Sequence, residues 1–446
     1  MPTRDPSASS SRHLALQADI RAVLSVAMRA GELLCRAGAE SAVVEESVEG
    51  IARAYGVRGC WCSATVTHII TTVDDPDIPL PFTVVRGVRS RTMDFQRLVA
   101  VDTVIARIKE GSIPLAEAAT EMKLAAGAKR PFGVAMRILI MLVVTASTAL
   151  LLGGSPLDAA VSAGGTLITL LLTETLTSRG ILAMVRAFVG GLVTAALTIT
   201  LVALRLPVQE LLAIAGSIMI LLPGALMVTS TREGIAGDLQ SSTARGLEAL
   251  LTGAVIASGL GLAIIVGQQL GVGLSVTPLA SPLVNLPVQV ASAGVAVVFF
   301  ALSNYAPPRV FMAAGAVGAL SWLIYLIMRG PFHSPDLMAT FVAALIVGLI
   351  GWMLARWQRV PLVTHVIPSA YPLLPGILLV RAMLALVQGQ NSDGLGLFAQ
   401  TLFISLMIAL GVALGNLAAS VLARASDPAV RRLRALPLPL FGARSG

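Results

Sequence analysis

The sequence predicts a mainly α-helical polytopic membrane protein with two inverted five-helix repeats, ten spans in all, preceded by a small α+β domain. Three observations support this prediction: a very apolar composition, a motif that occurs twice, and a one-sided distribution of basic residues. Of the 446 residues, 56% are hydrophobic and 13% are charged, which is far too apolar for a soluble protein of this length. After residue 133, apolar runs of roughly 20 residues recur, and each is long enough to cross a bilayer core.

Residues 14–130 have the patterns of a soluble cytoplasmic α+β domain, and residues 1–13 are predicted to be a disordered tail. Apolar residues at helical spacing predict four helices, and segments rich in valine, isoleucine and threonine predict two strands. The predicted helices are 15–37, 40–55, 94–111 and 114–127, and the predicted strands are 57–73 and 82–90. Cys60 and Cys62 form a CxC motif with no second pair nearby, so a metal site is not predicted.

The apolar region divides into two similar halves. The ten predicted spans are about 134–152, 157–177, 181–204, 208–231, 244–268, 286–304, 308–328, 337–356, 362–386 and 395–423. The first five match the last five when shifted by 152 residues, which predicts five-span repeats over 134–268 and 286–423, followed by a cytoplasmic tail over 424–446. Because five is odd, the second repeat must start on the opposite side of the membrane, as in the inverted repeats of secondary transporters.

The letters LLPG occur at residues 221–224 and again at 373–376, and another glycine follows each copy 13 positions later, at Gly237 and Gly389. A proline removes a helical hydrogen bond, and a helix break in lipid survives only where it faces protein or a watery cavity. We therefore expect a half-helix to start at each copy, with free N–H groups that favour a carboxylate. A simple proline kink is the alternative. The candidate substrate-binding residues are Pro223, Gly224, Pro375 and Gly376.

Charged residues near these breaks are candidates for binding substrate or protons, since charges retained inside a membrane usually pair or relay ions. The candidate substrate-binding cations are Arg232 and Arg381. The candidate proton-coupling acids are Asp238, Glu174 and Glu233, and the supporting residues are Gly237, Arg245 and Glu248. For each acid, the alternative is a solvated helix end or a structural ion pair.

The net charge of +8 is distributed as in a membrane protein rather than a nucleic-acid-binding one. If the soluble domain lies inside the cell, thirteen lysines and arginines flank the spans on the cytoplasmic side. Only Arg205, Arg329 and Arg381 flank them on the outer side. This asymmetry favours ten spans in the bacterial cytoplasmic (inner) membrane, with both termini in the cytoplasm.

Three stretches resemble the threonine/serine exporter family: AGAESAVVEESVEGIARAYGV (37–57), MDFQRLVAVDTVIARIKEGSIPLAEAATEMKLAA (93–126) and LLPGALMVTSTREGIAGDLQSSTARGLEALL (221–251). The resemblance extends from about residue 30 to 420. The positions that match the family pattern are Gly38, Glu45, Pro223, Gly224, Arg232, Gly237, Asp238, Arg245, Pro375 and Gly376. Glu233 departs from it, since relatives more often have aspartate there.

The resemblance implies a secondary exporter of threonine and serine, driven by the proton gradient and needing no other cofactor. Its expected partners are the amino-acid substrate and the lipid bilayer, with a homo-oligomer possible and nucleic acid excluded. Export of a dicarboxylate such as succinate is the alternative, because positive helix ends and arginines also suit that substrate. A membrane-anchored hydrolase is a weaker alternative, because matched helix breaks serve no purpose in an anchor and the soluble domain has no nucleophile motif. We therefore expect a transporter and not an enzyme.

Overall fold

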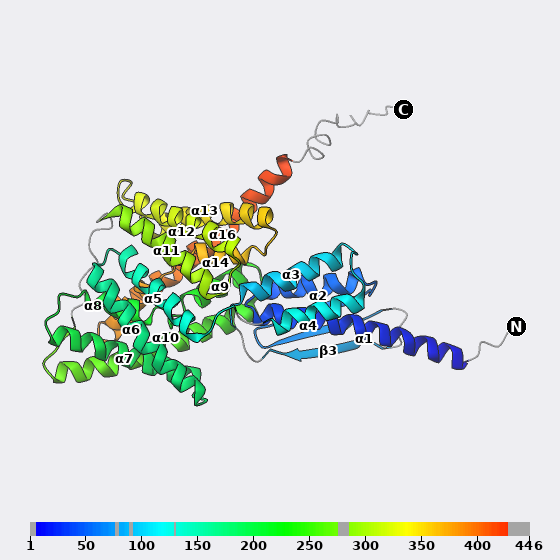
Figure 1. The fold of residues 1–446 in the computed structure, drawn as a ribbon, viewed down its shortest axis with the longest axis horizontal. Helices are drawn as coiled ribbons and strands as arrows, with labels where there is room; N and C mark the ends of the chain where they lie inside the picture. Colours follow the sequence, from blue (N-terminus) through cyan, green and yellow to red (C-terminus); the bar gives the residue numbers. More distant parts are fainter. Residues whose placement is uncertain (1–5, 76–79, 89–91, 129–130, 275–284, 427–446) are drawn as a thin grey trace, which may run out of the picture.

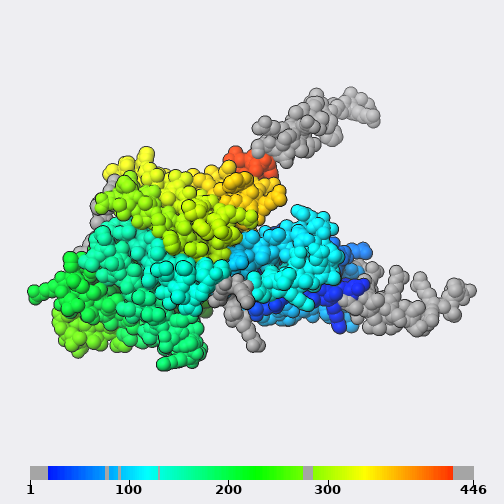
Figure 2. All heavy atoms as spheres, in the orientation of Figure 1, coloured from blue at the N-terminus to red at the C-terminus, as the bar shows by residue number. Residues whose placement is uncertain are grey.

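The computed structural model describes residues 6–75, 80–88, 92–128, 131–274 and 285–426. Figure 1 shows a small domain of helices and strands at one end, coloured blue to cyan, and a larger helical body at the other. The space-filling view shows the two parts packed against each other (Figure 2). The predicted α+β domain and the predicted helical region are therefore both present, and they are in contact with each other.

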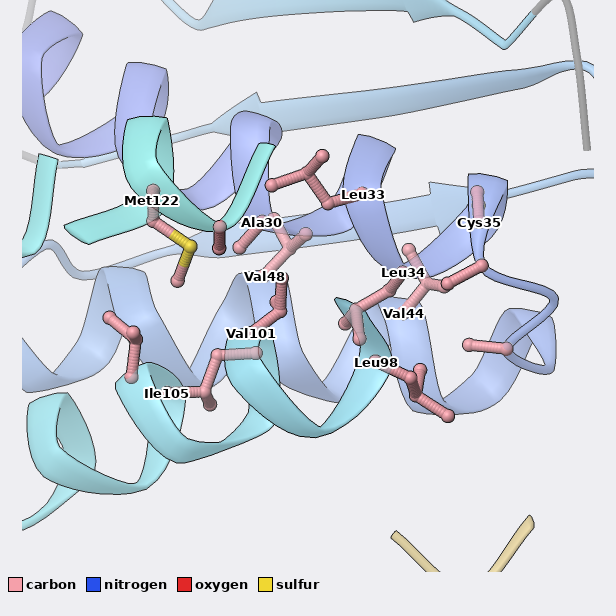
Figure 3. Close-up of a cluster of buried hydrophobic side chains, with 14 of the residues drawn as sticks. Ala30, Leu33, Leu34, Cys35, Val44, Val48, Leu98, Val101, Ile105 and Met122 are labelled. Carbon is pink, nitrogen blue, oxygen red and sulfur yellow. The ribbon is translucent and has the colours of Figure 1, made fainter. Parts of the chain in front are cut away.

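The N-terminal domain has four helices and three strands. These are α1 (Pro6–Arg36), α2 (Ser41–Ala54), β1 (Cys60–Ala64), β2 (His68–Val73), β3 (Phe82–Gly87), α3 (Phe95–Lys109) and α4 (Leu115–Gly127). The strands form one antiparallel sheet in the order β1-β2-β3. The helices pack on one face of this sheet around a shared apolar core (Figure 3). The other face carries Trp61 and Val85, which are both exposed.

The sequence prediction was wrong at two places in this domain. Residues 57–73 form two strands instead of one, because the chain turns at Thr65. The Thr65 hydroxyl accepts hydrogen bonds from the backbone N–H groups of Thr67 and His68 at 3.4 and 3.2 Å, so a side chain makes the turn without glycine or proline. Residues 6–13, predicted to be disordered, extend α1, since an established helix adds turns at low cost.

The apolar body is a series of helices whose starts recur at a spacing of 152 or 153 residues. The first series is α5 (Val134–Leu151), α6 (Pro156–Ser178), α7 (Ala183–Ala203), α8 (Glu210–Ile218), α9 (Gly224–Ile235) and α10 (Leu239–Gln269). The second is α11 (Leu286–Ser303), α12 (Pro308–Arg329), α13 (Asp336–Gln358), α14 (Val363–Ser369) with the 3₁₀ turn η1 (Tyr371–Leu373), α15 (Gly376–Val387) and α16 (Asn391–Ser426). Helices α5 and α11, like α9 and α15, differ by 152 residues at both ends.

Eight of the described helices are long and apolar enough to cross a membrane, which makes this a multi-pass membrane protein. The pair formed by α14 and the segment Tyr371–Val387 is bent by 43° and gives a ninth span if it crosses as one unit. The predicted span at 208–231 is not one helix, because α8 and α9 are short and are separated at residues 219–223. The count of ten spans and the inversion of the repeats therefore remain predictions.

The N-terminal domain docks on one end of this helical body. Its apolar core includes Val310 near the start of α12, and Ala355 and Val360 at the end of α13. The backbone N–H of Phe95 in α3 donates to the Asn304 carbonyl oxygen at the end of α11, at 2.9 Å. The helix ends that contact the domain define the near side of the body, and the opposite ends define its far side.

Candidate functional site

The two LLPG motifs are helix breaks that lie against each other. Pro223 is the N-cap residue of α9, and Pro375 is the N-cap residue of α15, so each half-helix starts at the predicted glycine. A Cβ atom on Gly224 would lie 3.8 Å from the Leu374 Cβ in the other break. A Cβ on Gly376 would lie 3.1 Å from Met219 and 3.4 Å from Leu222 in the first break. Residues 152 positions apart thus meet at one place.

The repeated downstream glycines end the two half-helices. Gly237 has φ +92° after α9, and Gly389 has φ +78° after α15, a backbone conformation that favours glycine. The N–H of the residue after each glycine donates back into the helix, from Asp238 to the Glu233 carbonyl and from Gln390 to the Ala385 carbonyl, both at 2.9 Å. This is the Schellman ending of a helix. Gly237 therefore fixes the C-terminal end of α9.

The space between the two breaks is narrow and mostly apolar. Its lining includes Met219, Leu374 and Ile377. The polar groups at its wall are Thr148 and Tyr371, whose hydroxyls hydrogen-bond to each other at 2.8 Å. The Tyr371 ring also stacks on Phe300, with ring centroids 4.7 Å apart. In this conformation the half-helix starts are packed together, and little room is left between them for a ligand.

The charged residues that follow the first break contact the N-terminal domain. The Arg232 guanidinium in α9 forms an ion pair with Glu40, the N-cap residue of α2, at 2.9 Å. Next to it, the hydroxyls of Ser41 and Ser241 hydrogen-bond at 2.8 Å. The side chain of Asp238 accepts the Ser241 N–H at 2.9 Å and caps α10. These contacts attach the soluble domain directly to the broken helix.

The environment of Asp238 suits a structural role better than proton transfer. Burial by itself raises the pKa of Asp238, but hydrogen bonds from the Ser241 backbone and from the hydroxyls of Ser241 and Ser41 outweigh it. The net result is a pKa below the ordinary value for aspartate. A carboxyl that stays ionised at all physiological pH values is a poor proton carrier.

Glu233 and Arg245 form the most buried ion pair in the described part of the chain. The Arg245 Nε donates to the Glu233 Oε2 at 2.7 Å, and the two side chains are 9% and 2% exposed for arginine and glutamate respectively. The Glu233 Oε1 is buried without a hydrogen-bond partner among the described residues. A buried carboxylate with one open oxygen is better suited to take up a proton than any other acid on α9 or α10.

The remaining candidates lie apart from this pair. Glu174 in α6 accepts from Arg137 in α5 at 2.9 Å, and both side chains are about half exposed, so the structure makes it a peripheral ion pair. Glu248 follows Arg245 on α10 and is half-buried. Arg381 lies on α15 and lines a larger cavity that adjoins the second break. The sequence prediction missed Glu40, Ser41 and Arg137, because each contacts its partner across a long separation in the chain.

Replacement of Glu40 by glutamine is expected to loosen the contact between the soluble domain and α9. The Glu40–Arg232 pair is only 22% and 16% exposed, so its loss leaves a partly buried arginine uncompensated, at a cost of about 1–2 kcal/mol. Hydrogen exchange of the backbone amides at 239–242 should accelerate by about fivefold or more. Glu46→Gln is the matched control, because Glu46 is 81% exposed and pairs with Lys109 at 3.5 Å. Equal exchange in both variants would contradict a docking role for Glu40.

Comparison with known protein families gives two matches, and the boundary between them falls between the two halves of the helical body. A family model described as "Putative threonine/serine exporter" matches residues 25–267, and one described as "Threonine/Serine exporter, ThrE" matches residues 289–418. A "Probable threonine/serine exporter" of Mycobacterium tuberculosis is 28% identical over 416 residues, covering 90% of this chain and 77% of that protein. A "Threonine/serine exporter" of Corynebacterium glutamicum is 27% identical over 408 residues, covering 89% and 82%. No solved structure matches the chain.

Proposed function

We propose that this chain, which belongs to the threonine/serine exporter family, exports threonine and serine across the cytoplasmic membrane by proton antiport. The observation that supports a transport cycle is the meeting of the two helix breaks. From this meeting point, α9 runs to the near side, where Arg232 contacts the soluble domain. Helix α15 runs to the far side, where Arg381 shares a cavity with the first residue of α13.

Other counterpart helices also run in opposite directions, which supports inverted repeats. Helix α11 ends on the near side, at the Phe95–Asn304 contact. The approach to α5 lies on that same side, because the ring of Phe132, two residues before α5, packs on Tyr305 with centroids 4.9 Å apart. Helix α12 begins on the near side at Val310, and α13 ends there at Ala355. An opposite orientation of the halves gives each side of the membrane an equivalent route to the breaks.

In the proposed cycle, one half rocks against the other and opens the breaks to one side at a time. The substrate carboxylate then meets the free N–H groups at the start of α9 or α15, at Gly224 and Gly376. Glu233 carries the proton, and Arg245 holds its carboxylate in place while it is ionised. The soluble domain lies in the cytoplasm, in agreement with the many basic residues on the near side. Its attachment to α9 allows it to influence when that half opens.

Counterflow of labelled threonine into proteoliposomes tests this proposal. We expect uptake against preloaded unlabelled threonine, and net movement that responds to an imposed pH gradient. Absence of threonine flux would contradict the substrate, and flux that ignores the pH gradient would contradict the coupling. Faster counterflow with succinate than with threonine would favour dicarboxylate export instead.

The variant Pro223→Ala with Pro375→Ala tests the breaks. Alanine lets a helix continue where proline interrupts it, so we expect folded protein whose threonine flux falls by about tenfold or more. Pro156→Ala is the matched control, because Pro156 occupies the first turn of α6, where proline removes no helical hydrogen bond. Normal flux in the double variant would exclude the breaks from the transport path.

A further inference from the structure

A cavity of about 340 Å³ lies on the far side of the helical body, where α5, α11, α12, α13, α15 and α16 meet. It extends from the second break, at Pro375, to Arg381, Arg329 and Asp336. Asp336 is the first residue of α13, and the other end of that helix packs on the soluble domain, about 34 Å away at 1.5 Å per residue. The cavity therefore lies at the outer end of the protein if the soluble domain is cytoplasmic.

Arg381 is a cation in the lining of this cavity. It lies on an apolar half-helix, one and a half turns after the break, where a charge is costly unless it has a partner or a function. Among the residues that the structure describes, no carboxylate or carbonyl oxygen pairs with its guanidinium. A guanidinium presents several N–H donors in a planar fork that matches a carboxylate. Arg381 is thus available to a ligand carboxylate.

Asp336 supplies the opposite charge, and it is held in a fixed position. Its Oδ1 accepts from the Arg329 Nε at 2.6 Å and from the Tyr325 hydroxyl at 3.1 Å. Among the described residues, the contact to its Oδ2 is a long one, 3.5 Å from the Gln400 Nε2. A carboxylate with one well-bonded oxygen and one weakly bonded oxygen can accept N–H bonds from an ammonium group.

We propose that this cavity is the outward-facing binding site for a zwitterionic amino acid, with Arg381 taking the carboxylate and Asp336 the ammonium group. Thr340 and Gln400 line the same cavity and provide hydrogen-bonding groups for a side-chain hydroxyl. The proposal rests on the proposed export of amino acids.

Binding measurements on the purified full-length protein test this assignment with three probes. These are L-threonine, 1-amino-2-propanol, which lacks the carboxylate, and 3-hydroxybutyrate, which lacks the ammonium group. We expect the wild-type protein to bind threonine at least about tenfold more tightly than either fragment, because only threonine uses both charges. Equal affinity for threonine and one fragment, or tighter binding of succinate, would overturn the proposal.

The variants assign each charge to its residue. Arg381→Gln should lose at least about tenfold in threonine affinity while its affinity for 1-amino-2-propanol stays unchanged. Asp336→Asn should lose threonine affinity while 3-hydroxybutyrate binds as well as before or better. Arg205→Gln is the control, since Arg205 is an exposed arginine that follows α7, outside the cavity. Wild-type threonine affinity in Arg381→Gln would overturn the assignment, even if Asp336→Asn fails to fold.

Counterflow separates this proposal from the proposed function. If wild-type protein carries threonine and Arg381→Gln does so with an unchanged KM, the cavity assignment fails and the export function stands. If wild-type protein carries no threonine, the function itself fails. A raised KM in Arg381→Gln, with normal folding, supports both.

Discussion

Leucine in place of Gly259 is expected to prevent most of the protein from folding into its native helical body. A Cβ on Gly259 in α10 would collide with the backbone carbonyl oxygen of Phe188 in α7 and lie 2.9 Å from the Leu192 nitrogen. A Cβ on the neighbouring Gly191 would lie 2.5 Å from the Ile256 carbonyl oxygen. The backbones of α7 and α10 are therefore in direct contact, as small residues allow in membrane helices. No side-chain rotation can relieve a clash with a backbone atom.

Overpacking typically lowers the free energy of unfolding by about 1–3 kcal/mol, and we expect a clash with a backbone atom to cost at least the upper value. The measurements are the yield of monodisperse protein in detergent and its apparent melting temperature. Gly164→Leu is the matched control, because a Cβ at Gly164 in α6 meets nothing within 4 Å. If Gly259→Leu has the same apparent melting temperature as Gly164→Leu, α7 and α10 are not packed this closely.

The same contact recurs in the second half, where Gly411 of α16 lies against α13. A Cβ there would lie 2.7 Å from the Phe341 carbonyl oxygen. Gly259 and Gly411 are 152 residues apart, so the repeat spacing that was first visible in the LLPG motifs also applies to the closest helix crossings. Gly411→Leu should therefore reduce the folded yield as strongly as Gly259→Leu does.

The sequence predicted the helices well because membrane spans have a strong local signal. Apolar runs of the required length located the long helices, and Pro223 and Pro375 located both half-helix starts. Within the span predicted at 208–231, a break was expected at Pro223, and the structure separates α8 from α9 at residues 219–223. The turn at Thr65 was missed because a threonine hydroxyl makes its hydrogen bonds, and threonine is otherwise typical of strands.

The candidate site was less predictable, because its key contacts join distant parts of the chain. Arg232 was selected as a residue near the substrate, yet its partner is Glu40, in another domain. Asp238 was selected as a proton carrier, but the Ser241 N–H makes it a helix cap. Periodicity and motif spacing describe local structure, and they do not reveal which residues meet after folding. Only Glu233 and Arg245, one helical hairpin apart, were close enough in sequence for a pairing to be anticipated.

Loss of the Glu233 carboxylate is expected to be the most damaging single change among the charged residues. Glu233→Gln leaves the Arg245 guanidinium, 9% exposed, without its partner. Removing one member of a buried ion pair typically costs about 3–5 kcal/mol, because the remaining charge stays buried and uncompensated. Chemical unfolding in detergent should show this loss. Glu174→Gln is the matched control, since the Glu174–Arg137 pair is 45% and 32% exposed, and such pairs contribute about 0–1 kcal/mol.

Replacing both partners separates the structural role of this pair from proton coupling. Glu233→Met with Arg245→Met removes both charges and fills similar volume, so much of the lost stability should return. If Glu233 carries the proton, this folded double variant keeps threonine counterflow but no longer responds to a pH gradient. If the double variant keeps its response to the pH gradient and Glu174→Gln loses it, proton coupling depends on Glu174 in α6 and not on Glu233. A double variant as unstable as Glu233→Gln would mean that more than the unpaired charge of Arg245 destabilises the single variant.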